Sequence, residues 1–209
     1  MLQQTQIVWF VKVSDVITLD VNFYLYGLTI KGLGTTEYHM KLLKDLCDLK
    51  YFGCFAMTEL SHGSNVQGVE TTATYDVASK SFILQTPHEW AMKYWIGNLG
   101  KTAQRAVVFA QLITKNVNYG VHIFITDIRD STHETYPGIE IGDIGHKIGC
   151  DGIDNGWMMF NQYKVPKENL LNWYANVTDE GEYHSEIKSD NKRFAWHMAA
   201  LSAGRHGCA

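Results

Sequence analysis

Residues 53–76 read GCFAMTELSHGSNVQGVETTATYD, and this stretch is the most informative about the fold of the chain. It opens with an apolar run, residues 54–57, that suits a buried strand. It then breaks into a polar loop over residues 58–65 and resumes as the alternating segment 72–76. A strand that ends in a loop rich in small polar groups can present backbone N–H groups and hydroxyls to a flat polar ligand. We therefore expect β structure with a ligand-facing loop.

Short β-rich runs, separated by Gly, Asn and Asp turns, continue through residues 51–180. Many short strands at this spacing predict a sandwich or a barrel. The clearest runs are residues 81–84, 106–113, 121–125 and 156–160. The sequence thus predicts a mainly β middle domain, sandwich- or barrel-like, flanked by α-helical segments, and an α+β protein overall.

Helical patterns flank this β region. Apolar residues recur at helical spacing over residues 40–49, and Thr35 or Thr36 would cap such a helix, with Glu37 in its first turn. Residues 193–201 are also compatible with a helix, and the polar residues 182–191 before them read as a loop. The expected division is an N-terminal helical part over residues 1–50, a ligand-binding β domain over 51–180, and a linker with the start of a C-terminal helical domain over 181–209.

Composition and charge narrow the classes of partner. The chain has 209 residues, and 18 basic against 22 acidic side chains give a formal net charge of −4. This balance gives no reason to expect nucleic acid or an anionic membrane as a partner. No run approaches the ~20 apolar residues of a membrane-spanning helix. The four cysteines form no CxxC pair, so neither a metal site nor a disulfide framework is expected, and they read as buried thiols in a reducing compartment.

The 53–76 stretch resembles the middle-domain signature of the acyl-CoA oxidases, flavoenzymes related to the acyl-CoA dehydrogenases. Further blocks resemble the same family in the same order, and together they cover roughly residues 22–207. Several long blocks in order are more specific than any single motif. The blocks are Leu33-Gly34-Thr35, KYWIGNLGKT (93–102), GIEIGDIGHK (138–147), Asp154-Asn155-Gly156, VPKENLL (165–171) and ALSAGR (200–205).

The resemblance implies an FAD-dependent enzyme of peroxisomal fatty acid β-oxidation. Such an enzyme oxidises acyl-CoA to trans-2-enoyl-CoA and passes the electrons to molecular oxygen, which yields hydrogen peroxide. It also implies acyl-CoA as substrate, a homodimer when full length, and a peroxisomal location, although the chain ends Gly207-Cys208-Ala209 without a Ser-Lys-Leu signal. Neither nucleic acid nor a membrane is expected as a partner.

Three residues match the family's cofactor contacts. Thr58 matches a flavin-contacting threonine. The alternative is a threonine at a strand end whose side chain hydrogen-bonds to its own backbone. Gly97 matches a second contact, since glycine lets backbone approach a planar ligand, but it can equally be a plain turn glycine. Trp95 would shield one flavin face, whereas a lone tryptophan is more often a core residue. The segment Tyr94-Trp95-Ile96-Gly97-Asn98 is nearer the dehydrogenase pattern than the oxidase Trp-Trp-Pro-Gly-Gly, which leaves the electron acceptor open.

Ser64 and Asn65 lie where the family places a loop near the thioester and pantetheine, and the alternative for both is a solvated loop. His62, Glu59 and Glu70 are tempting acid–base groups, but the family uses none of them as its base. The family's base is a glutamate far into the C-terminal helical domain, so no catalytic residue is assigned here. We expect the chain to be a fragment or a short isoform without oxidase activity of its own. The alternatives are a non-catalytic relative that binds acyl-CoA or a protein, and an acyl-CoA dehydrogenase.

Overall fold

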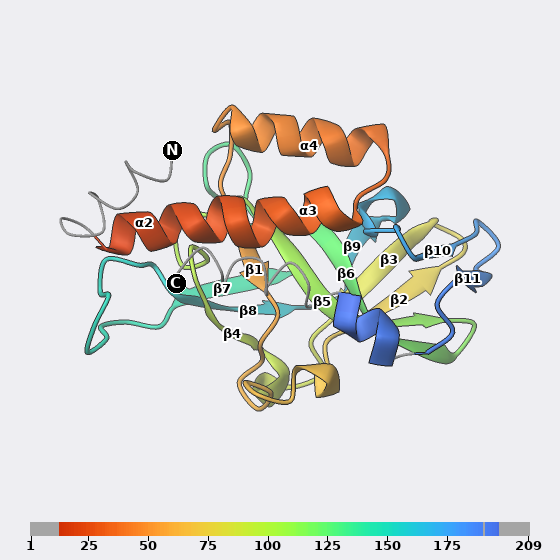
Figure 1. Ribbon diagram of the computed structural model, residues 1–209. Coiled ribbons are helices and arrows are strands. Elements are labelled where there is room, and N and C mark those ends of the chain that lie inside the picture. The colour runs from red at the N-terminus through yellow and green to blue at the C-terminus, as the bar shows by residue number, and fades with distance from the viewer. Residues whose placement is uncertain (1–12, 190, 197–209) are drawn as a thin grey trace.

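The computed structural model describes residues 13–189 and 191–196. Three contiguous segments form one helical rod, namely α2 (Val13–Asp20), a π-helical segment (Val21–Gly27) and α3 (Leu28–Leu33). The rod lies along one side of the β structure, with α4 (Glu37–Cys47) packed beside it (Figure 1). A final helical turn covers residues 191–196. No helix in these described ranges is both long and apolar enough to cross a membrane.

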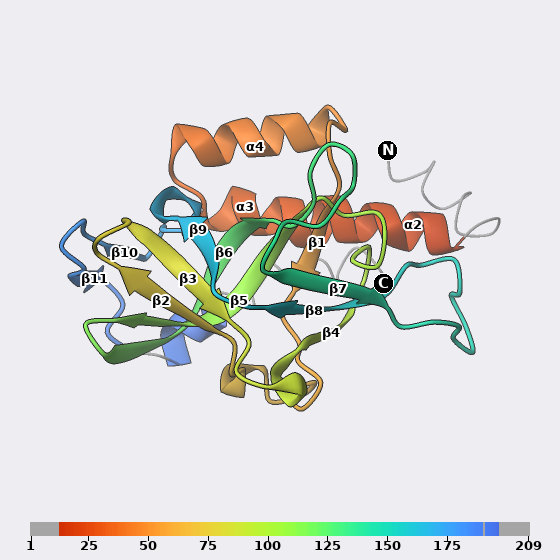
Figure 2. The same cartoon turned by 180° about the vertical axis from the view of Figure 1, so that it is seen from behind.

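The remaining elements of the described residues are short 3₁₀ turns and strands, and the strands form three sheets. A six-stranded sheet has the order β1-β5-β2-β3-β9, with β6 also paired to β5, while β4-β8-β7 and β10-β11 form smaller sheets. The strands are β1 (Gly53–Ala56), β2 (Thr72–Asp76), β3 (Ser81–Gln85), β4 (Lys93–Ile96), β5 (Arg105–Thr114), β6 (Val117–Asp127), β7 (Ile139–Asp143), β8 (Gly156–Phe160), β9 (Tyr163–Pro166), β10 (Ala175–Val177) and β11 (Tyr183–Ser185). Figure 2 shows the side of the molecule that carries β7 and β8. The prediction of a mainly β domain with flanking helices is confirmed.

Strand β5 lies between two hydrophobic cores and contributes side chains to both. Its side chains alternate between the faces of the sheet, as the two-residue period of a strand requires. Ala106, Val108 and Leu112 enter a core shared with the β4-β8-β7 sheet, whereas Val107 and Phe109 enter a core closed by the helical rod and α4. Since both faces are covered, the strand reads as an almost continuous apolar run.

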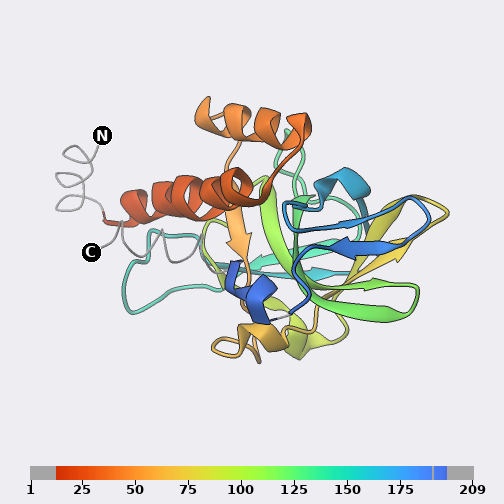
Figure 3. The ribbon, with the colours of Figure 1, turned by 45° about the vertical axis from the view of Figure 1, so that its right-hand side comes forward.

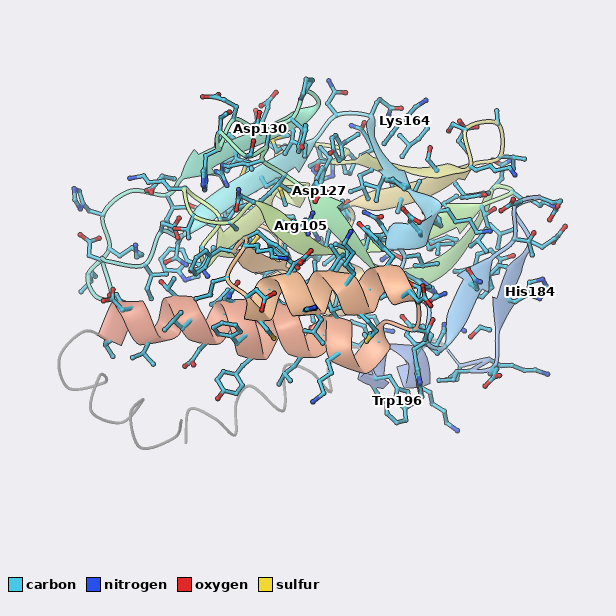
Figure 4. All side chains as sticks on the ribbon, turned by 90° about the horizontal axis from the view of Figure 1, so that it is seen from above. Arg105, Asp127, Asp130, Lys164, His184 and Trp196 are labelled. Atoms are coloured by element: carbon cyan, nitrogen blue, oxygen red, sulfur yellow. The ribbon has the colours of Figure 1, made fainter. Side chains whose placement is uncertain are left out.

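Polar contacts join the helices to the sheet. Arg105 Nε donates to Asp127 Oδ1 at 2.6 Å, and the Arg105 guanidinium lies 4.3 Å from the Tyr51 ring centroid. Figure 4 labels Arg105 and Asp127 where they lie close to α4. The Tyr51 hydroxyl donates to the Leu42 carbonyl of α4 at 2.7 Å. These contacts fix the helical layer to the β5–β6 pair.

Close packing between the rod and β1 needs glycine at position 53. A Cβ built on Gly53 would collide with the ring of Tyr26, which is fully buried. We expect Gly53→Ala to lower the free energy of unfolding by about 1–3 kcal/mol, as overpacking of a core does. Gly32→Ala is the matched control, because a Cβ there meets open space in α3, and it should stabilise the helix by up to ~1 kcal/mol. Urea denaturation of both variants tests the pair, and equal stabilities would contradict it.

The N-terminus of α4 is capped as expected, at Thr36, but its partner in the capping box is a histidine. His39 N–H donates to Thr36 Oγ1, and His39 Nδ1 accepts from the backbone N–H groups of Thr35 at 3.2 Å and Thr36 at 3.5 Å. With Nδ1 accepting, Nε2 carries the proton and donates to the Glu168 carbonyl at 2.8 Å. The fold therefore requires a neutral imidazole.

This requirement predicts a pH dependence of stability. Burial lowers the pKa of His39 below its ordinary 6.5, against the opposing effect of the Glu168 carbonyl. The stabilisation is therefore complete above about pH 6.5 and is lost as the pH falls through the lower folded-state pKa. Urea denaturation at several pH values should show a smaller acid-dependent loss of stability in His39→Gln than in the wild type. Identical slopes for the two proteins would exclude His39 as the source.

Two smaller expectations are wrong. The predicted loop over residues 182–191 contains β11, which pairs with β10 and lies beside the turn of the β5–β6 hairpin (Figure 3). Backbone pairing rather than side-chain alternation makes this short strand. Of the described cysteines, Cys54 is buried, but Cys47 and Cys150 are exposed, because each lies at the end of an element or in a loop. Part of the helix expected over 193–201 lies outside the described residues.

Candidate functional site

A cavity of about 420 Å³ opens beside the end of β1, and it brings three predicted site residues together. Thr58, Trp95 and Gly97 all line it. Its walls come from the ends of β1 and β4, the helical rod and the loop over residues 144–155. That loop extends beneath the N-terminal end of α2 (Figures 1 and 2). The size falls within the range of small-molecule and cofactor sites, about 300–1,000 Å³.

Thr58 is bound to the neighbouring segment rather than to its own backbone. Its hydroxyl donates to the Tyr94 carbonyl at 2.8 Å, and its carbonyl accepts from the Tyr94 N–H at 3.1 Å. This pairing continues the approach of β1 and β4 past the last residue of β1. With its proton directed at Tyr94, the hydroxyl oxygen keeps lone pairs that can accept a bond from a ligand.

Trp95 is not a core residue, contrary to the usual position of a lone tryptophan. The residue is 58% exposed, and its φ of +66° lies in the left-handed region that bulky residues rarely adopt. The register of the β4–β8 pair shifts between Lys93 and Ile96, which marks a bulge at this point. Bulges next to functional sites redirect side chains. Here the bulge places an exposed aromatic ring at the cavity.

Gly97 lies against the helical rod. A Cβ on Gly97 would stand 3.2 Å from Val21 Cγ2, so the backbone approaches the rod closely. The next residue, Asn98, is buried with a φ of +66°, and its Nδ2 donates to the Thr18 carbonyl at 2.8 Å. Since α2 carries Thr18, this bond fixes the loop after β4 to the helix that covers the cavity.

The apolar wall of the cavity was not predicted from the sequence. Ile17, Val21 and Leu25 line it from the rod, at intervals of four residues. This spacing is readable as a helical stripe. The resemblance began near residue 22, however, and gave no reason to connect the stripe with the cofactor contacts. Lys147, Cys150 and other residues of the 144–155 loop close the opposite side.

Ser64 and Asn65 do not line this cavity. Both are exposed on the loop that leads to the 3₁₀ turn Val66–Gly68, where the Asn65 carbonyl accepts from the Gly68 N–H. Their expected contact with acyl-CoA stays a prediction, and so do the flavin contacts of Thr58, Trp95 and Gly97.

The tempting acid–base residues have structural partners. The Glu59 side chain is fully buried and its carboxylate accepts from Lys93 and from the backbone of Thr71. His62 Nδ1 lies 3.4 Å from Glu59 Oε2, and Glu70 pairs with His88 at 3.1 Å. Within the part of the chain that the structure describes, no carboxylate lines the cavity and no cluster of ligating side chains fits a metal ion.

Comparison with known proteins places this fold in a family. The sequence model of "Acyl-CoA dehydrogenase, middle domain" matches residues 54–163, and the chain belongs to this family. Its relatives are acyl-CoA oxidases: the chain is 48% identical over 189 residues to acyl-coenzyme A oxidase 3, peroxisomal, of Arabidopsis thaliana. That alignment covers 90% of this chain and 28% of the relative.

Solved structures of acyl-CoA oxidases have the same fold. Acyl-CoA oxidase 1 of Yarrowia lipolytica superposes with a TM-score of 0.91 at 39% identity, over 99% of this chain and 30% of that one. Acyl-CoA oxidase-2 of Caenorhabditis elegans, bound with FAD, ascaroside-CoA and ATP, gives a TM-score of 0.81 at 37% identity, over 87% of this chain and 27% of the other. The chain thus spans less than a third of the length of these relatives. The division into three parts stays a prediction.

Proposed function

We propose that the protein acts as an FAD-dependent acyl-CoA oxidase of fatty acid β-oxidation in the peroxisome. The observation that carries the proposal is the meeting of Thr58, Trp95 and Gly97 in one cavity, in a fold shared with acyl-CoA oxidases. The flavin and the acyl-CoA thioester meet at this cavity, and molecular oxygen is the electron acceptor. The full-length protein is a homodimer.

The residues present fit a flavin ring. A planar ring needs a close backbone approach, a flat hydrophobic neighbour and polar groups at one edge. Gly97 lines the cavity without a side chain of its own, and the exposed Trp95 ring supplies the flat neighbour. Thr58 offers a hydroxyl oxygen as acceptor at the end of β1. The stripe Ile17, Val21 and Leu25 excludes water from the opposite side.

Bound FAD supplies the redox chemistry, which is acceptance of a hydride from the acyl-CoA β-carbon and release of the electrons to oxygen as hydrogen peroxide. The residues of this chain position the flavin ring and shield it from water. Gly97 and Trp95 would hold the flat ring, and Thr58 would meet its polar edge. Ser64 and Asn65 bind the acyl-CoA on the adjoining loop. No described residue is assigned as the base that removes the α-proton, because Glu59 is buried in an ion pair and lies outside the cavity lining.

The test is a flavin titration of the purified chain, followed by a peroxide assay with a long-chain acyl-CoA. We expect FAD fluorescence to be quenched with a stoichiometry of one flavin per chain, and the visible flavin spectrum to shift when acyl-CoA is added. Peroxide release would establish the oxidase in this chain itself. A spectral shift without turnover would support the site and assign the base to another segment. No flavin binding would overturn the proposal in favour of a non-catalytic relative.

A further inference from the structure

Glu59 and Lys93 form a buried ion pair next to the cavity, outside its lining. Their side chains are both fully inaccessible, and Lys93 Nζ lies 3.0 Å from Glu59 Oε1. Their backbones also meet in an isolated antiparallel bridge. Lysine and glutamate are almost never fully buried unless they are paired. The pair therefore needs an explanation beyond general packing.

The Lys93 ammonium connects its own strand to two other segments of the chain. Its three N–H donors point at the Met57 carbonyl at 3.1 Å, the Phe109 carbonyl at 2.7 Å and Glu59 Oε1. Met57 follows β1, and Phe109 lies in the middle of β5. An ammonium group has three donors, so this group is fully satisfied. Lys93 thereby fixes β4 against the end of β1.

The Glu59 carboxylate fixes the other side of the loop. Its Oε2 accepts from the Glu70 N–H at 2.7 Å, and its Oε1 accepts from the Thr71 N–H at 2.9 Å and the Thr71 hydroxyl at 2.6 Å. These bonds hold the two ends of the 59–71 loop together, immediately before β2. Ser64 and Asn65 lie within this loop.

Both groups are charged at neutral pH. Burial lowers the pKa of Lys93 to about 8, while the Glu59 carboxylate opposes this shift. Burial by itself would raise the pKa of Glu59, but Lys93 and the hydrogen bonds from Thr71 and Glu70 hold it below its usual value. The contacts described above are therefore charge-assisted, which makes them the stronger and more directional kind.

The pair adjoins the cavity-lining residues in sequence and in space. Thr58 directly precedes Glu59, Trp95 follows Lys93 by two positions, and Tyr94 between them exchanges two hydrogen bonds with Thr58. The left-handed conformation of Trp95 is one that persists only where surrounding contacts impose it. Lys93 and Glu59 supply such contacts on the residues immediately before the bulge.

We propose that Glu59 and Lys93 are positioning residues of the flavin cavity, which hold Thr58 and Trp95 in the relative placement that a flavin ring requires. The inference rests on the proposed function of this cavity. An apolar pair of similar volume would often serve the stability of a core equally well. It could not, however, bind the Met57 carbonyl, the Phe109 carbonyl and the segment just before β2 at once. Directed hydrogen bonds, rather than burial alone, are what this pair adds.

Three variants test the inference. Glu59→Gln keeps the shape and removes the charge, Lys93→Met removes the donors, and Asn169→Ala removes a buried hydrogen bond to the Ile125 carbonyl that lies outside the cavity lining. Each is compared with the wild type in urea denaturation, in FAD affinity, and in the residual fluorescence of flavin at saturation. Fluorescence at saturation reports ring placement against Trp95 and not the fraction folded.

We expect Glu59→Gln and Lys93→Met to weaken FAD binding at least about tenfold and to leave bound flavin brighter than in the wild type. Asn169→Ala should lose stability and keep both flavin readouts. If Lys93→Met does not fold, Glu59→Gln decides. Folded variants with wild-type affinity and quenching would overturn the positioning role and leave the proposed function standing. A wild-type chain that binds no flavin would overturn the proposed function itself.

Discussion

Replacing Lys93 with methionine is expected to lower the free energy of unfolding by about 3–5 kcal/mol, the range for breaking a buried ion pair on one side. The change leaves the Glu59 carboxylate buried without its cation, and it removes the hydrogen bonds that Lys93 donates to the carbonyls of Met57 and Phe109. Urea denaturation followed by circular dichroism measures the loss.

The matched control is Lys50→Met. Lys50 also pairs with a carboxylate at short range, since its Nζ lies 2.6 Å from Asp45 Oδ1, but its side chain is 60% exposed. Exposed pairs contribute roughly 0–1 kcal/mol, so this variant should stay close to the wild type. A Lys93→Met variant within 1 kcal/mol of the wild type, or no more destabilised than Lys50→Met, would refute the importance of the buried pair.

Replacing Gly97 with leucine is expected to weaken FAD binding by roughly 10- to 100-fold, the equivalent of overpacking a tightly packed site. The new side chain would begin 3.2 Å from Val21 Cγ2, a residue that also lines the cavity, so the leucine would displace part of the lining. Gly97→Ala should have a smaller effect, because its single methyl group requires Val21 to move by only a few tenths of an ångström. Flavin titration of each purified variant gives the affinities.

Gly32→Leu is the control for this series. Position 32 lies on α3, where a Cβ meets open space, so leucine there should leave FAD affinity unchanged. Unchanged affinity in Gly97→Leu as well would exclude a flavin contact at Gly97, whatever the affinity of the wild type. The graded order of glycine, alanine and leucine separates a steric effect from a general loss of stability.

The strands and the capped helix were predictable because their patterns are local. β5 carries alternating apolar residues for two cores, and Thr36 stands where a cap is required before α4. The helical rod over residues 13–33 lies inside the N-terminal part that was expected to be helical, but its segments were not located from the sequence. It contains β-branched and aromatic residues and Gly27, which all lower helix propensity, and packing on β1 and the rest of the sheet stabilises it.

The candidate site was predictable only in part. Thr58, Trp95 and Gly97 came from resemblance, and the structure brings them together. The contributions of Ile17 and Lys93 depend on tertiary placement. A charged side chain in a β-rich run reads as surface from sequence, and only the three acceptors around Lys93 Nζ explain why it is buried.

The parallel pairing of β1 with β5 has a consequence for the order of folding. Gly53 pairs with Arg105, which the ribosome adds 52 residues later, whereas β5 and β6 form an adjacent hairpin. Contacts of long sequence separation form slowly because the loop must close first. A nascent chain that has reached β4 thus carries an apolar strand without its sheet partner. β1 is therefore expected to stay unpaired, and prone to aggregation, until residue 108 has emerged.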